Sequence, residues 1–307
     1  MTAQTQTAVL DGTAFSIDPS TRVESLSLRV ADLQGQIAFY QQALGLQLHW
    51  QEENQAALGA GETDILHLLE EPQSRRYRRV SGLYHFALLY PDRRELARAI
   101  ARLFELRVPN SPTDHIMTKS AYLEDPEGNG VELYTESPED GHFDYENGRF
   151  GAVRADGSLS DGREALDLES LFSHLQPGDR LDDPVSAKLR LGHMHLHVGN
   201  VEDALAFYHG VLGFDIMGQA PAYHVAFVSA GGYHHHIGLN TWQGEGAPPP
   251  PEDALGLRYF SVALPDAQAL QAVTDRVAFA GLVGQPVQGG LLVQDPSRNG
   301  VLLKVTG

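Results

Sequence analysis

The chain contains no cysteine among its 307 residues. This absence excludes disulfides, thiolate metal ligands and thiol nucleophiles. Any metal ion must therefore be held by His, Asp or Glu side chains. The sequence also lacks an apolar run long enough to span a bilayer, and its first residues have neither the basic region nor the apolar core of a secretory signal. These absences predict a cytoplasmic protein with no membrane partner.

Positive charge is scarce in this chain. Lys and Arg number 22 against 40 Asp and Glu, which gives a formal net charge of −18. A nucleic acid is therefore excluded as the main partner, because binding its phosphates needs a basic surface. The hydrophobic share of 42% and the charged share of 20% are typical of a globular protein, and 307 residues suffice for two domains.

The sequence repeats itself internally. Residues 23–46 resemble residues 191–214: in both, an alternating strand is followed at the same interval by Phe-Tyr, in a helical segment that ends at Gly. Residues 82–92 likewise resemble residues 256–266, each a strand that ends in Pro-Asp before an apolar-periodic helix. The second and fourth units both close with Asp-Pro, two further residues, and Asn-Gly-Val before a last strand.

Four related units therefore begin near residues 23, 82, 190 and 256, and each has the order strand, helix and about three further strands. The predicted fold class is α+β, with four βαβββ modules in two domains, whose mixed curved sheets form cup-shaped sites. The predicted domain organisation is an N-terminal tail (1–20), an N-terminal domain (21–136), a partly ordered connector (137–188) and a C-terminal domain (189–307). Within the connector, only residues 166–175 indicate local structure.

Strand alternation assigns two faces to the first strand of the third unit. Met194, Leu196 and Val198 fall on one side, and three histidines fall on the other. The apolar side is expected to pack on a helix. The polar side then lines a concave sheet surface where a ligand could bind, with His193 as a candidate ligand and His195 as a lining residue.

Glu132 stands where a strand begins after a turn-forming Asp-Pro-Glu-Gly-Asn-Gly stretch. His115 and Tyr122 lie upstream of it, and histidines recur at strand positions elsewhere, at His85 and His193. This set can supply two imidazoles and one carboxylate to a divalent metal ion. Such a facial triad on non-haem iron leaves coordination positions open for substrate and oxygen.

The segment 113–132 resembles the signature of extradiol dioxygenases: a His, a short gap, an apolar residue and Tyr, Asp-Pro, a Gly and then Glu. Ala121 departs from this pattern, because a larger apolar residue is usual there. Residues 229–242, with three consecutive histidines, resemble two-domain bacterial catechol 2,3-dioxygenases. Nearly the whole chain is similar to the vicinal-oxygen-chelate superfamily, which includes glyoxalase I, bleomycin-resistance proteins and extradiol dioxygenases.

The resemblance implies roles for individual residues. It implies that His85, His193 and Glu132 are the metal ligands, and that Tyr122 and His115 contact the substrate or its hydroxyls. The ion would be Fe(II), with Mn(II) left open. The remaining ligand positions would take a small aromatic diol and O2.

The resemblance also implies that one histidine of the run 234–236 transfers protons during oxygen activation. Family spacing favours His235, whereas strand alternation places His234 and His236 together on one face. His235 is therefore the first candidate for the acid–base residue and His236 the second.

The units differ in their metal-binding capacity. Positions equivalent to the ligands carry other residues in the first and fourth units: Ser25, Tyr259 and Leu302. We therefore expect the second and third units to pair across the two halves of the chain into one complete site. The first and fourth units would then pair into a metal-free cup.

The predicted function is an Fe(II)-dependent extradiol dioxygenase that opens a catechol-type ring. The alternatives are a hydroquinone-type ring-cleaving dioxygenase, a glyoxalase-like metal isomerase, and a metal-free protein that sequesters a drug. An isomerase of this kind usually has two carboxylates, whereas the position equivalent to Glu132 in the third unit is expected within the histidine run. The substituents of the substrate and the oligomeric state, including a homo-oligomer, stay open.

Overall fold

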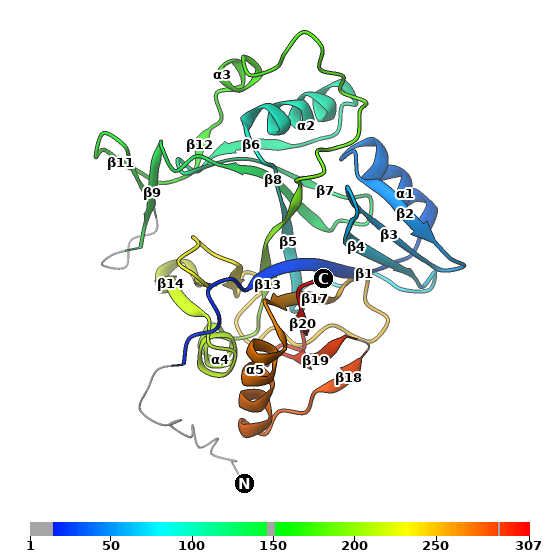
Figure 1. The fold of residues 1–307 in the computed structure, drawn as a ribbon, viewed down its shortest axis with the longest axis vertical. Helices are drawn as coiled ribbons and strands as arrows, with labels where there is room; N and C mark the ends of the chain where they lie inside the picture. Colours follow the sequence, from blue (N-terminus) through cyan, green and yellow to red (C-terminus); the bar gives the residue numbers. More distant parts are fainter. Residues whose placement is uncertain (1–14, 146–150, 288) are drawn as a thin grey trace.

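The computed structural model describes residues 15–145, 151–287 and 289–307. Most of its strands belong to two large mixed sheets with helices packed against them (Figure 1). Each large sheet combines one βαβββ module from the first half of the chain with one from the second half. The fold is therefore α+β with four such modules, as predicted from the sequence. The domain limits 21–136 and 189–307 stay a prediction.

The first and fourth modules form one sheet, and the second and third form the other. The eight-stranded sheet has the order β18 (Gln285–Val287), β19 (Gly290–Gln294), β20 (Gly300–Val305), β17 (Gly256–Leu264), β1 (Arg22–Val30), β4 (Thr63–Glu70), β3 (Gln55–Ala60) and β2 (Gln47–Gln51). The nine-stranded sheet has the order β12 (Glu164–Ala165), β6 (Ser111–Asp114), β7 (Thr118–Glu124), β8 (Gly130–Glu136), β5 (Gly82–Leu89), β13 (Arg190–His197), β16 (Ile237–Asn240), β15 (Val225–Ser229) and β14 (Asp215–Ala220). The predicted pairing of modules is confirmed.

The helices begin at side-chain caps that the repeats share. The helical segments are α1 (Leu33–Gln42), α2 (Arg93–Glu105), α3 (Leu168–Phe172), α4 (Val201–Leu205), the π-helical η2 (Ala206–Val211), the 3-10 turn η3 (Pro221–Tyr223) and α5 (Ala267–Phe279). In each module, an Asp or Asn accepts a hydrogen bond from the backbone N–H three residues later: Asp32, Asp92, Asn200 and Asp266. Such a cap satisfies a backbone donor that the first helical turn leaves unpaired.

Two equivalent turns connect the helices of one module to the strands of the next. Asp125 accepts hydrogen bonds from the backbone and side-chain N–H groups of Asn129, both at 2.8 Å, and from the hydroxyl of Tyr40 in α1 at 2.7 Å. The second turn repeats this arrangement around Asp295, to which Tyr208 donates at 3.1 Å. Both carboxylates are buried. The modules are thus joined in pairs by polar contacts as well as by the core.

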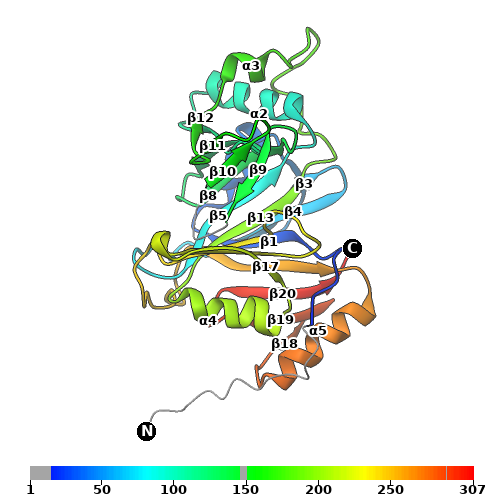
Figure 2. The same cartoon turned by 90° about the vertical axis from the view of Figure 1, so that its left-hand side faces the viewer.

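The apolar strand faces meet in a common core. Leu26 and Leu28 of β1 and Met194 and Leu196 of β13 belong to one buried cluster. Figure 2 shows β1 and β13 near each other at the middle of the molecule, and the two strands are in contact. The sequence predicted a helix against each apolar face. The structure instead packs the central strands of the two sheets partly on each other, while the helices cover the flanking strands.

The connector between the second and third modules holds more structure than its composition indicated. It contains α3, which falls within the expected stretch 166–175, and strand β12, which extends the nine-stranded sheet. It also forms a small sheet in the order β11 (Leu159–Ser160), β10 (Gly151–Arg154) and β9 (Gly141–Asp144). No helix of the described residues is both long and apolar enough to cross a membrane.

The Tyr40→Phe substitution tests the contribution of these turns to stability. Removing the hydroxyl leaves Oδ2 of the buried Asp125 with one donor, the side-chain amide of Asn129. We expect the free energy of unfolding to fall by about 0.5–1.5 kcal/mol, the typical net contribution of a hydrogen bond. The measurement is denaturant unfolding followed by circular dichroism. Tyr259→Phe removes a hydroxyl that donates to neither turn carboxylate and should leave the unfolding midpoint unchanged. Equal midpoints for the two variants would contradict the assignment.

Candidate metal centre

Strand β5 lies between β13 and β8 in the nine-stranded sheet. Its Ala87 pairs with His193 of antiparallel β13 on one side and with Glu132 of parallel β8 on the other. His85, two residues before Ala87, projects from the same face of the sheet. The small side chain of Ala87 leaves space between its two neighbours, so that the longer side chains can converge above it.

The three predicted metal ligands converge in this space. The Nε2 atoms of His85 and His193 lie 3.4 Å apart, and they lie 3.2 and 2.9 Å from Oε2 of Glu132. All three side chains are buried. Because donors at about 2.1 Å from an ion lie about 3 Å apart when they occupy one face of an octahedron, the three atoms fit a single bound cation.

The protonation states also suit a metal ion. Burial raises the pKa of Glu132, but the imidazoles of His193 and His85 outweigh this effect and hold that pKa well below its usual value. Burial lowers the pKa of His193 by more than Glu132 raises it. Metal ions bind ionised carboxylates and neutral imidazoles, which are the forms these directions favour at neutral pH. The set is also held in place, because Ser120 donates a hydrogen bond to Oε1 of Glu132 at 2.7 Å.

Tyr122 and His115 lie beside this trio. The hydroxyl of Tyr122 lies 2.8 Å from Nε2 of His115, and Nδ1 of His115 is hydrogen-bonded to the carbonyl of Gly162 in the connector. Since a carbonyl can only accept, Nδ1 carries the proton, and in the neutral ring Nε2 accepts from Tyr122. Burial, with the negative charge of Glu132, raises the pKa of Tyr122 well above its usual value, so this residue stays a phenol.

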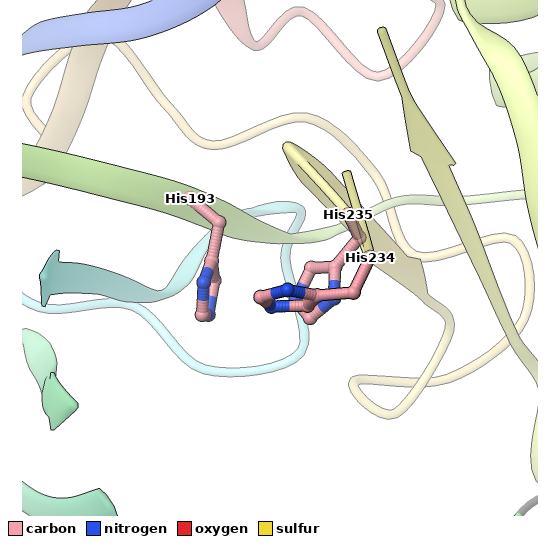
Figure 3. A group of neighbouring side chains, drawn as sticks. All are labelled: His193, His234 and His235. Atoms are coloured by element: carbon pink, nitrogen blue, oxygen red, sulfur yellow. The ribbon is translucent and has the colours of Figure 1, made fainter. Parts of the chain in front are cut away.

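The histidine run is divided between the cavity and the protein interior. His234 and His235 line the cavity, and their rings face that of His193 (Figure 3). His236 lies outside the cavity lining and hydrogen-bonds through Nδ1 to the hydroxyl of Ser229 at 2.8 Å. Strand alternation therefore failed here, because β16 begins only at Ile237 and the run belongs to the preceding turn.

The converging side chains form one wall of a cavity of about 700 Å³. Tyr84 and Trp242 line it and are 39% and 41% exposed, so the cavity reaches the molecular surface. His195 also lines it, as the sequence predicted. Aromatic side chains supply much of the remaining wall: Tyr84, Tyr122, Phe143, Tyr145, Phe227 and Trp242.

The connector completes the cavity, which the sequence reasoning missed. Phe143 and Tyr145 of the connector stack on each other, and Tyr145 stacks on Phe227 of β15. Gly162 and Arg163 of the connector also line the cavity. The only sequence signal for this role was the aromatic pair at 143 and 145 within an otherwise polar, glycine-rich stretch.

The strand register corrects the expected counterpart of Glu132 in the third module. Glu132 pairs with Ala87 in the parallel β5–β8 ladder, and Gly238 holds the equivalent place opposite His195 in β13–β16. The counterpart therefore lies two residues beyond the histidine run and has no side chain. In the other cup, His67 of β4 holds this position in the first module, and Leu302 of β20 holds it in the fourth. Neither position supplies a carboxylate.

Comparisons with known proteins agree with this architecture. The sequence model of the Glyoxalase/Bleomycin resistance protein/Dioxygenase superfamily matches residues 22–133 and 190–303. A catechol-2,3-dioxygenase of Bacillus subtilis (strain 168) is 39% identical over 284 residues, which cover 92% of this chain and 96% of that protein.

Solved structures show the same fold. A putative dioxygenase of Bacillus subtilis superposes with a TM-score of 0.60 at 14% identity, covering 95% of this chain and 86% of that one. Glyoxalase I of Zea mays superposes with a TM-score of 0.52 at 17% identity, covering 93% and 92%. The two matched segments contain all three converging side chains, and together with the relative from Bacillus subtilis they show that this chain belongs to the Glyoxalase/Bleomycin resistance protein/Dioxygenase superfamily.

Proposed function

We propose that this protein is an extradiol dioxygenase that opens a catechol-type aromatic ring with O2, at Fe(II) held by His85, His193 and Glu132. The observation that carries the proposal is the convergence of two imidazole nitrogens and one carboxylate oxygen within 3.4 Å of one another, in the wall of a cavity that reaches the surface. The relative named catechol-2,3-dioxygenase supports the reaction.

The proposed donor set is the one typical of non-haem Fe(II) oxygenases. His85, His193 and Glu132 would hold the cation and leave positions for a diol and O2. A cation held there would lower the pKa of a bound catechol hydroxyl and bring the diol and oxygen together. Mn(II) has the same ligand preferences, and the metal content of the purified protein distinguishes the two.

Tyr122 and His115 are proposed to orient the substrate. The hydroxyl proton of Tyr122 points to Nε2 of His115, so its lone pairs are left for a hydroxyl of the diol. The hydrogen bond between His115 and the carbonyl of Gly162 fixes the imidazole ring and holds the connector against this side of the cavity. The phenol and the imidazole thereby position the diol without taking its proton.

His235 is proposed to accept and return protons. Burial, reinforced by His193, lowers the pKa of His235 well below its usual value, so the ring is a neutral base at physiological pH. Its ring centroid lies 4.3 Å from that of His193, closer than the 6.0 Å of His234. His236, the second candidate from the sequence, faces Ser229 instead of the cavity.

Two alternatives are less well supported. An isomerase of the kind considered above needs a second carboxylate, and Gly238 stands where the third module would supply it. A metal-free sequestering protein would have no use for a buried carboxylate between two imidazoles, since burying unpaired charge is costly. A hydroquinone-type dioxygenase shares the donor set and differs in the position of the second hydroxyl.

The reaction itself is tested by loading the protein with Fe(II) anaerobically and adding catechol in air. We expect the yellow absorbance of a ring-opened semialdehyde. Tight iron binding without colour, followed by turnover of a hydroquinone, would support the hydroquinone alternative. A protein that binds neither iron nor manganese would overturn the proposal.

Glu132→Gln tests the metal site directly. The amide removes the only negative charge of the trio, so we expect iron binding and ring cleavage to be lost while the fold is kept. Iron per chain after gel filtration and the circular dichroism spectrum are the measurements. Glu124→Gln, at an exposed carboxylate near the end of β7, is the control and should retain iron. Full iron occupancy in Glu132→Gln would reject the assigned ligand.

The pair His235→Asn and His236→Asn tests the acid–base assignment. Only the first residue lines the cavity, so kcat for His235→Asn should fall by about 10²–10⁴-fold, the usual contribution of a general acid–base group. The kcat of His236→Asn should change far less, and its effect should fall on thermal stability, because it loses the contact with Ser229. Steady-state kinetics under saturating O2 measures both. The reverse ranking would assign the role to His236.

Ala87→Leu tests the geometry above β5. The larger side chain would occupy the space in which His193 and Glu132 meet, so we expect loss of iron with the sheet intact. Ala87→Ser, which is almost unchanged in size, should retain iron. Iron content and thermal melting are measured for both variants. Normal iron content in Ala87→Leu would show that the ion is held elsewhere.

A further inference from the structure

A second set of nitrogen donors adjoins the proposed iron site. His193, His234 and His235 each offer a ring nitrogen within 4.8 Å of the others, and all three side chains are buried. Figure 3 shows His193 of β13 on one side and the two neighbouring histidines of the turn before β16 on the other. The group therefore joins two segments of the third module, whereas the iron trio joins the second and third modules.

The hydrogen bonding of these rings is incomplete. The Nδ1 atoms of His193, His234 and His235 are buried and have no hydrogen-bond partner among the described residues. Buried polar atoms in folded proteins are usually paired, with protein, water or an ion. The unpaired Nδ1 atoms of His193 and His235 indicate room for a ligand, whereas Nδ1 of His234 faces Glu136.

A carboxylate stands behind one of the rings. Oε1 of Glu136 lies 3.6 Å from Nδ1 of His234, so a small movement of either side chain would form a hydrogen bond. Tyr233 donates a hydrogen bond to the same oxygen and holds it in place. Metal-binding histidines commonly present one nitrogen to the ion and the other to a carboxylate, which fixes the ring and makes it more basic. Glu136 is in the position for this role.

The three imidazole rings favour particular cations. Three imidazoles, with no carboxylate among the direct ligands, suit the borderline cations Zn²⁺, Ni²⁺ and Cu²⁺ better than the harder Mn²⁺ or Mg²⁺.

We propose that His193, His234 and His235 form a second cation site, which takes Zn²⁺ or a related late transition metal through three imidazoles and has Glu136 behind it. The site shares His193 with the proposed iron site and occupies the wall that holds the proposed proton-transferring residue. A cation bound there therefore inhibits ring cleavage. Only this inhibition rests on the proposed function; the binding itself does not.

The Glu132→Gln variant separates the two sites, because it disables the iron trio and leaves the three histidines intact. We expect this variant to bind one Zn²⁺ per chain in calorimetry and to retain it through gel filtration. Adding His234→Asn or His235→Asn should weaken Zn²⁺ binding by more than about tenfold, since loss of even an outer partner of a metal ligand costs about 10–100-fold. His236→Asn in the same background is the matched control and should bind Zn²⁺ normally.

A measurement on the unmodified protein guards against variants that fold poorly. Crystals soaked in Zn²⁺ should show an anomalous peak enclosed by the three rings. A peak at Glu132 alone, or a Glu132→Gln variant without Zn²⁺ affinity, would overturn the second site. These outcomes are distinct from failure of the proposed function, which shows in the wild-type protein as an absence of iron or of product from catechol.

Discussion

The antiparallel pairing of β5 with β13 is the constraint on which the candidate site depends. It joins two segments more than a hundred residues apart and sets His193 beside Ala87, while the parallel pairing of β5 with β8 sets Glu132 on the other side. A shift of β5 by one residue would turn His85 to the apolar face and Phe86 to the cavity. The buried apolar residues on the opposite face oppose that shift, because each would lose its place in the core. Core packing therefore fixes the geometry of the polar site.

The sequence was sufficient to predict this much because repeats and alternation are local patterns. The four modules and the face of β13 that carries histidines followed from them. The pairing of the second module with the third followed from the ligand positions that the family resemblance implies. The histidine run was harder: alternation grouped His234 with His236, but the run precedes the strand, and turn geometry set His234 and His235 toward the cavity. The counterpart of Glu132 was displaced to Gly238 for the same reason, since only the strand register locates it.

The connector could not have been placed from the sequence. Its strands are short, and its contacts are with distant residues: the carbonyl of Gly162 with His115, and the ring of Tyr145 with Phe227. Short strands carry little periodicity, and their position depends on partners elsewhere in the chain. The consequence is functional, because the part of the chain that was expected to be a linker supplies part of the cavity wall and bounds the space left for a substrate.

The eight-stranded and nine-stranded sheets share one architecture but use their polar side chains differently. Both are built from the same modules and the same capped helices, and both have serine, histidine or tyrosine on the concave face. In the eight-stranded sheet, Ser25 and Ser261 hydrogen-bond to each other at 2.9 Å across β1 and β17. These two strands hold the place that β13 and β5 hold in the other sheet. There, polar side chains satisfy one another across the strands.

In the nine-stranded sheet, the polar side chains converge around one buried carboxylate. Ser120 fixes one oxygen of Glu132, and the two imidazoles share the other. These contacts hold the carboxylate and both imidazoles close enough together for one cation to bind all three. A donor set that is already assembled loses less conformational entropy on binding than one that must form. The pairing of the modules brings this donor set together, because His85, His193 and Glu132 come from three adjacent strands and meet above Ala87.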